Sequence, residues 1–97
     1  MRITQAQADM IRKLLQDSLG EESKVWLFGS RVNDEKRGGD VDLYVETMQP
    51  CDLPTKLSLM SAIQRSIGLR KVDLLIRTSS SPERAIYATA KSEGVRL

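Results

Sequence analysis

Hydrophobic positions near the start of the chain follow a helical spacing. Thr4 is placed to cap the amino end of a helix over residues 4–19, and Gly20 is placed to end it. The apolar stripe consists of Ile3, Met10, Ile11, Leu14, Leu15 and Leu19. Charged side chains fall on the opposite side. The pattern therefore predicts an amphipathic helix with one face buried.

Three short segments have the pattern of strands. Residues 24–28 form an apolar run that ends at Gly29, which predicts a buried strand with Trp26 and Phe28 in the core. Residues 71–77 predict a strand of the same kind. Residues 41–45 alternate, with Val41, Leu43 and Val45 on one side and Asp42 and Tyr44 on the other. We expect Tyr44 to pack against a neighbouring wall, with stacking on a nucleotide base as the alternative.

Two further helices are expected. Asp52 and Pro54 predict a helix start near residue 53, and Gly68 ends that helix. Its inward positions are Leu57, Met60, Ile63 and Ile67. The run Ser81-Pro82-Glu83 predicts an N-cap at Ser81 and a last helix over 82–93. The apolar stripe of that helix is thin, so we expect it to pack at an edge of the fold or against a partner.

The order of these elements predicts the fold. A helix, a strand, a short turn, a strand, a helix, a strand and a helix follow one another over residues 1–97. This order is typical of one α/β (α+β) domain, with a small mixed sheet of about three strands flanked by helices. The polar segment 31–39, which ends in two glycines, predicts a loop that starts with a helical turn.

Composition narrows the classes of function. The net charge is only +2, and the 15 basic residues form no cluster, so nucleic acid is the least favoured partner. The absence of histidine excludes a Ser-His-Asp arrangement and most zinc sites. The single Cys51 forms no internal disulfide, which indicates the cytoplasm. We expect no signal peptide and no membrane span.

Carboxylates are the residues best suited to chemistry. Asp40 and Asp42 lie two positions apart on one face of a strand, with Cα atoms about 6.6 Å apart. Their mutual repulsion is relieved if they bind a divalent cation, and magnesium prefers oxygen ligands. Asp73 is a charge within an apolar strand. If that strand lies beside 41–45, the three carboxylates together could hold two ions for phosphoryl or nucleotidyl transfer.

A glycine-serine turn precedes the carboxylates. Gly29 allows a sharp turn and the close approach of a phosphate, and Ser30 offers a hydroxyl and a backbone amide to it. Arg31 can contact phosphate or form a surface salt bridge; the two readings are equally supported. These residues predict a site for the triphosphate of a nucleotide.

The motifs GSR, GDVDLYV and VDLLI, in this order, resemble the DNA polymerase beta-like nucleotidyltransferase superfamily, and in particular its minimal prokaryotic members. The resemblance covers residues 24–77. It implies the nucleotidyltransferase core fold and magnesium-dependent transfer of a nucleoside monophosphate, AMP from ATP, to a hydroxyl. Small members of the family are often paired with a toxin of the HEPN type and can adenylylate one of its tyrosines, so the resemblance also implies an antitoxin.

The resemblance assigns roles by position. Gly29 and Ser30 match the phosphate-binding turn, Asp40 and Asp42 match the metal ligands, and Asp73 matches the third carboxylate, which helps to deprotonate the acceptor hydroxyl. Three features depart from the common pattern: Gly39 replaces a serine, Val32 replaces an alanine, and the spacer carries the acidic residues Asp34 and Glu35. These departures concern substrate preference and rate more than fold.

Structural explanations of the same aspartates stay open. Asp40 can cap a strand, Asp42 can be solvated on an exposed sheet face, and Asp73 can pair with Arg70 or Lys71. Three functions follow in order of preference: an active nucleotidyltransferase, a non-catalytic antitoxin that neutralises its partner by occlusion, and a nucleic-acid-binding subunit. The sequence leaves a monomer and a dimer equally open, and does not decide between a homo- and a hetero-oligomer.

Overall fold

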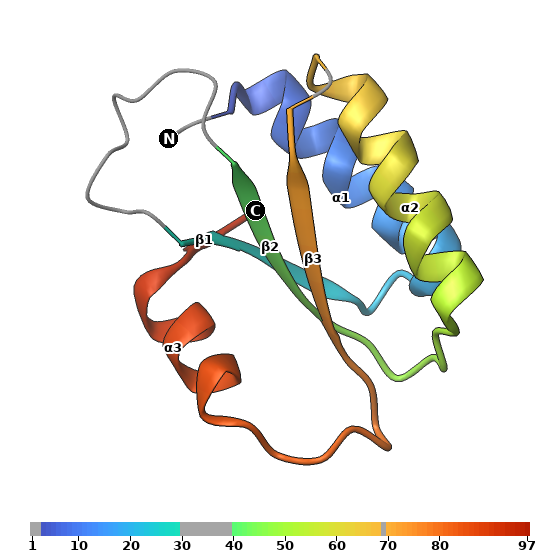
Figure 1. The fold of residues 1–97 in the computed structure, drawn as a ribbon, viewed down its shortest axis with the longest axis vertical. Coiled ribbons are helices and arrows are strands. Elements are labelled where there is room, and N and C mark those ends of the chain that lie inside the picture. The colour runs from blue at the N-terminus through green and yellow to red at the C-terminus, as the bar shows by residue number, and fades with distance from the viewer. Residues whose placement is uncertain (1–2, 30–39, 69) are drawn as a thin grey trace.

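A mixed four-stranded sheet with helices on both faces organises the chain (Figure 1). The computed structural model describes residues 3–29, 40–68 and 70–97. The strands are β1 (Lys24–Phe28), β2 (Val41–Glu46), β3 (Val72–Arg77) and β4 (Val95–Arg96), in the order β3-β2-β1-β4. The helices are α1 (Gln5–Leu19), α2 (Leu53–Ser66) and α3 (Ala85–Glu93). β2 runs antiparallel to β1. It runs parallel to β3, because α2 connects the two strands and returns the chain to the same end of the sheet.

The first two helices begin where the sequence predicts. Thr4 Oγ1 accepts a hydrogen bond from the Gln7 amide, and the Gln7 side chain accepts one from the Thr4 amide, which completes a capping box for α1. Asp52 caps α2 by accepting a bond from the Thr55 amide. The predicted helices at 4–19 and near 53 are therefore confirmed.

The two faces of the sheet pack differently. α1 and α2 cover one face, where alternate residues of β1, β2 and β3 form the main core with both helices. α3 covers the other face, where Tyr87 and Ala90 pack on Trp26 and Tyr44. Trp26 is buried, as predicted, and Tyr44 is fully buried against the rings of Trp26 and Tyr87. Tyr44 therefore packs against neighbouring side chains of the fold, as expected.

Two expectations about the surface and the ends of elements are wrong, and the sheet has one strand beyond those expected. Ser81 does not cap the last helix, because its hydroxyl accepts a bond from the Thr78 amide in a turn, and α3 starts at Ala85. The sheet gains a fourth strand, β4, whose two residues pair with β1. Met10 and Leu57, predicted to face inward, are each 52% exposed.

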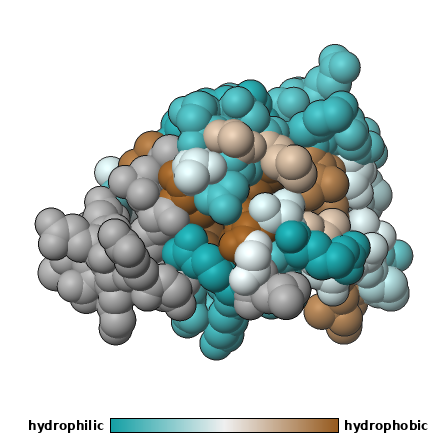
Figure 2. All heavy atoms as spheres, turned by 90° about the horizontal axis from the view of Figure 1, so that it is seen from above, coloured by the Kyte–Doolittle hydropathy of each residue, from teal (hydrophilic) through white to brown (hydrophobic). Residues whose placement is uncertain are grey.

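The molecular surface mixes apolar and polar areas. Viewed from above, apolar atoms gather near the centre of the face and hydrophilic side chains border them (Figure 2). No helix in the described part of the chain has the length and apolar character needed to cross a bilayer.

Candidate functional site

Asp42 and Asp73 lie side by side on the face of the sheet that α3 covers. The register of the parallel strands β2 and β3 pairs Asp42 with Asp73, and the antiparallel register pairs Phe28 of β1 with Asp42. Residues at the same level of adjacent strands are about 4.8 Å apart and point to the same face. The predicted adjacency of the two aspartate-bearing strands is therefore confirmed.

Gly29 lies directly against the carboxylate of Asp42. Its φ of 98° falls in the region that disfavours side chains. A Cβ at this position would overlap Asp42 Oδ2 and lie 2.9 Å from Asp42 Cγ. The turn after β1 therefore requires glycine both for its backbone conformation and for its contact with the carboxylate. Ser30 and Arg31, the other residues predicted to bind phosphate, lie outside the described residues, as does the 31–39 segment.

Asp40 precedes β2 and lies at the end of the same carboxylate face. Its Oδ2 is 4.0 Å from Lys71 Nζ, and both side chains are more than half exposed. An exposed pair at this distance contributes little to stability. Lys71 therefore lies beside Asp40, whereas the sequence had offered it as a partner of Asp73.

The donor set of Asp42 and Asp73 fits magnesium in its chemistry. Magnesium takes oxygen ligands and is commonly held by one or two carboxylates together with substrate phosphates. Within residues 3–29, 40–68 and 70–97, no group of three or more histidine, cysteine or acidic side chains is placed to hold a metal ion. The assignment of Asp40, Asp42 and Asp73 to one metal site stays a prediction.

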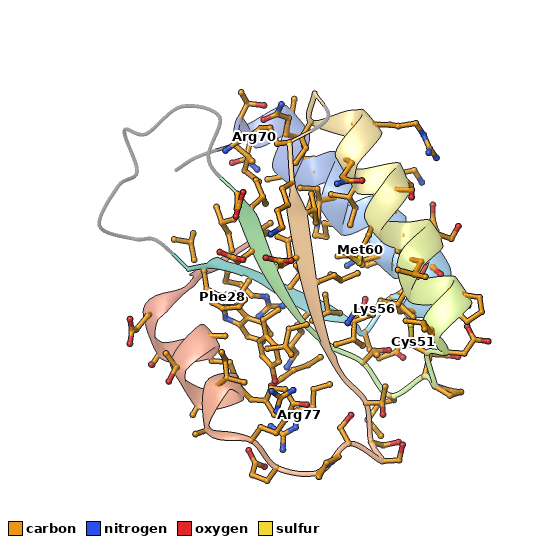
Figure 3. All side chains as sticks on the ribbon, in the orientation of Figure 1. Phe28, Cys51, Lys56, Met60, Arg70 and Arg77 are labelled. Atoms are coloured by element: carbon orange, nitrogen blue, oxygen red, sulfur yellow. The ribbon has the colours of Figure 1, made fainter. Side chains whose placement is uncertain are left out.

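A cavity of about 530 Å³ opens beside the two aspartates. Its lining comprises Phe28, Asp42, Leu53, Lys56, Leu57, Met60, Asp73, Leu74, Leu75 and Ile86. Figure 3 shows Phe28 on the α3 side of the sheet, and Lys56 and Met60 on the α2 side. The carboxylates are therefore the acidic part of a mainly apolar cavity that extends across β3.

An ion-pair network occupies the far end of the same sheet face. Two levels along the strands from the aspartates, Glu46 pairs in register with Arg77. Its Oε2 accepts a 2.7 Å hydrogen bond from the Tyr44 hydroxyl and lies 3.3 Å from Lys91 Nζ and 4.0 Å from Arg77 Nη1. Figure 3 shows Arg77 and Phe28 toward opposite ends of this face. The network joins β2, β3 and α3 away from the aspartates.

The network changes the pKa values of its members. Burial, together with the hydrogen bond to Glu46, raises the pKa of Tyr44 to about 12. Burial acts to raise the pKa of Glu46, but the hydrogen bond from Tyr44 and the charges of Lys91 and Arg77 outweigh it and lower that pKa below its ordinary value. Tyr44 is therefore held neutral and Glu46 ionised, which suits a structural role.

Sequence reasoning missed the apolar wall beside the aspartates. Leu53, Leu57 and Met60 follow the spacing i, i+4, i+7 on α2 and line the cavity, while Leu59 and Ile63 of the same helix are buried in the core. The signal was present, because α2 carries two adjacent apolar stripes and a helix needs only one to pack on a sheet. Leu57 is exposed rather than buried in the core, whereas Met60, which lines the cavity, also packs against the core as predicted.

Comparison with protein families gives a match over nearly the whole chain. Residues 9–96 match the family model described as polymerase beta, nucleotidyltransferase. A comparison with curated proteins finds no match.

Solved structures with the same fold come from toxin–antitoxin complexes. A chain of the MntA–HepT complex is 21% identical, with a TM-score of 0.70 over 96% of this chain and 70% of that one. A chain of a mutant MntA–HpeT complex is 23% identical, with a TM-score of 0.67 over 93% and 69%. A chain of the complex between a tri-AMPylated Shewanella oneidensis HEPN toxin and an MNT antitoxin is 22% identical, with a TM-score of 0.70 over 97% and 71%. At these identities the likeness shows a shared fold.

Proposed function

Because the chain belongs to the polymerase beta nucleotidyltransferase family, we propose that it transfers AMP from ATP to a hydroxyl group of a partner protein. The partner we propose is a toxin of the HEPN type, with a tyrosine as acceptor. The transfer would neutralise the toxin and make this protein its antitoxin. We place the reaction in the cytoplasm, where Cys51 stays reduced.

One observation carries the proposal: Asp42 and Asp73 occupy paired positions on adjacent parallel strands. Two carboxylates on neighbouring strands, open to a cavity, can serve a reaction that needs oxygen ligands and a proton acceptor together. Gly29, packed against Asp42, supports the same assignment, because it brings the turn after β1 to the carboxylate.

Each residue has a distinct proposed role. Asp40 and Asp42 would hold magnesium, which when bound neutralises triphosphate charge. Asp73 would accept the proton of the acceptor hydroxyl. The hydroxyl oxygen then forms a bond to the α-phosphorus of ATP, the bond from that phosphorus to the bridging oxygen breaks, and pyrophosphate leaves. Gly29, Ser30 and Arg31 would bind the triphosphate, the first two through the turn and Arg31 through its charge.

The acceptor is proposed from the matched structures. One of them contains a HEPN toxin that carries three AMP groups, in complex with an MNT antitoxin. The fold shared with a chain of that complex supports a HEPN-type partner for this chain. The acceptor would come from another molecule, since the described fold contributes only the carboxylate face and its cavity.

Mass spectrometry of a HEPN-type partner tests the reaction. The partner is incubated with this protein, ATP and magnesium, and its intact mass is compared with samples that contain a chelator or GTP. We expect AMP additions that require magnesium and map to tyrosine. An unchanged partner mass at a stoichiometric ratio would overturn the catalytic proposal.

The second candidate is neutralisation by occlusion without catalysis. The observation that favours it is the exposed apolar surface around the cavity, where Leu53 is 64% and Ile86 is 42% exposed. A complex that forms and inhibits the toxin equally well with Asp42→Asn would support occlusion. A complex that forms but fails to inhibit would support catalysis.

A further inference from the structure

The outer edge of β3 is open in the described part of the chain. β3 ends the sheet and pairs only with β2 there. Figure 1 looks onto this edge, with β3 in front of β2, α2 on one side and α3 on the other, and no further element drawn in front of it. A strand edge of this kind presents a row of backbone donors and acceptors that can pair with another chain.

Two hydrogen bonds at the ends of the β2–β3 ladder fix which backbone groups face outward. The Val41 amide donates to the Lys71 carbonyl, and the Thr47 amide donates to the Arg77 carbonyl. Alternate residues of a parallel strand direct both backbone groups to the same neighbour. The odd-numbered residues of β3 therefore face β2, and Val72, Leu74 and Ile76 direct their amides and carbonyls to the open edge.

Exposed apolar side chains border this edge on both sides. Six large hydrophobic side chains are exposed among the described residues, and three of them, Leu53, Leu57 and Ile86, line the cavity beside β3. Leu53 and Leu57 lie one turn apart on α2, and Ile86 lies on α3. Half of the large hydrophobic side chains that the described residues expose thus gather around one strand edge.

A second cavity continues the first along the strand. It has a volume of about 430 Å³ and shares Lys56 and Leu75 with the cavity that contains the aspartates. At its other end it reaches Thr78 and Arg84. The two cavities together follow β3 from Asp73 to the turn beyond its end.

We propose that the open edge of β3 binds an extended segment of the acceptor protein as an added strand. This rests on the proposed function only in taking the bound segment to be the one that carries the acceptor hydroxyl. An added strand would lie about 4.8 Å from β3 and alternate its side chains between the α2 and α3 sides. Apolar side chains face Leu53 and Leu57, and the intervening positions face Ile86 and the aspartates.

The geometry favours a strand over a helix as the occupant. A helix in the groove would use the apolar walls but leave the outward backbone groups of Val72, Leu74 and Ile76 without partners from the protein. An extended segment uses both, because its backbone pairs with those groups while alternate side chains reach the α2 wall. It also directs every second side chain to the face of the sheet that carries Asp73. The bound sequence would therefore have an apolar–hydroxyl–apolar pattern.

Amide hydrogen exchange tests the pairing. The probe is a synthetic peptide of about eight residues, with aliphatic residues at alternate positions and tyrosine at an intervening one. It is obtained by selecting a phage-displayed library of that pattern for binding to the protein. Binding should slow exchange at Val72, Leu74 and Ile76, and leave Asp73 and Leu75 unchanged. N-methylation of the peptide amides that pair with β3 should abolish binding. N-methylation of the intervening amides, which point away from β3, should be tolerated.

Matched variants test the groove. Leu57→Lys should weaken peptide binding by about tenfold, because a charge replaces apolar contact. Met10→Lys alters a side chain of equal exposure, 52%, on α1 outside the groove, and should leave binding unchanged. Equal effects of the two variants, or no selected peptide that discriminates them, would overturn the proposal.

Other outcomes separate this proposal from its alternatives. If amide exchange at Val72, Leu74 and Ile76 is already slow without peptide and sedimentation shows a dimer, the occupant of the edge is a second copy of the chain. This result would overturn the proposal. Slowed exchange on α2 and α3 without change on β3 would indicate a helix and also overturn it. The binding assay contains neither ATP nor magnesium, so its result does not depend on the reaction. Peptide binding in that assay, together with no AMP transfer in a separate assay that contains ATP and magnesium, would reject the proposed reaction while the docking surface stands.

Discussion

Gly29 packs against the carboxylate of Asp42 so closely that no side chain fits between them. The contact joins the turn after β1 to the acidic end of β2 and depends on a backbone φ of 98°. Glycine is therefore required here by conformation and by contact at once, which makes the position sensitive to the smallest substitution.

Gly29→Ala should lower both stability and activity. The positive φ costs an alanine about 1–2 kcal/mol, and the added methyl group displaces the Asp42 carboxylate. Thermal unfolding and AMP transfer to the partner measure the two effects.

Gly68→Ala is the matched control. Gly68 has a φ of 85°, but a Cβ there meets no atom of the other described residues within 4 Å. This variant should lose similar stability and keep its activity. If both variants transfer AMP at the wild-type rate, the contact with Asp42 has no functional role.

Tyr44→Phe should lower stability by about 1 kcal/mol at neutral pH, because the hydrogen bond to Glu46 is lost. Folding raises the pKa of Tyr44 to about 12, so above its ordinary pKa near 10 the unfolded state releases a proton that the folded state keeps. Stability therefore falls as pH rises from about 10 to 12, by about 2 kcal/mol. This part of the decline should be absent in Tyr44→Phe, and urea unfolding across that range measures it. Parallel stability curves for the two proteins would contradict the account.

Glu46→Gln should destabilise the packing of α3 by about 1 kcal/mol at neutral pH, because the charged contacts with Lys91 and Arg77 are lost. The folded state lowers the pKa of Glu46, so the stabilisation is present above its ordinary value of about 4.3 and is lost as pH falls through the folded pKa. Unfolding measured from pH 7 downward should show the curves of the wild type and the variant converging in acid. A constant difference down to acid pH would show that the charge of Glu46 is not responsible.

The sequence predicts most of the fold because its local signals agree with its packing. The caps Thr4 and Asp52 and the alternation over residues 41–45 mark elements that the structure contains. The start of α3 escapes prediction because Ser81 has two possible partners, and the turn with Thr78 takes its hydroxyl. β4 escapes because a two-residue strand has no periodicity and exists only through its pairing with β1.

The sequence singles out the aspartates of the candidate site but not the surroundings in which the structure places them. The i, i+2 spacing places Asp40 and Asp42 on one face, but only the register of β2 and β3 pairs Asp42 with Asp73. Which of the two apolar stripes of α2 packs on the sheet depends on how the helix is oriented against it. Leu57 belongs to the other stripe and is exposed beside the cavity. Tertiary geometry of this kind is not encoded in local spacing.

The paired aspartates are tested most directly by the rate of AMP transfer from labelled ATP to a HEPN-type partner, with Asp42→Asn and Asp73→Asn compared with the wild type. Asp17→Asn serves as the control, because Asp17 is exposed on α1 and lies in a surface pair with Lys13. We expect both site variants to fold with wild-type melting curves and to lose transfer by at least about a hundredfold, while the control transfers normally. Transfer at the wild-type rate by either site variant would show that Asp42 and Asp73 do not act together in the reaction.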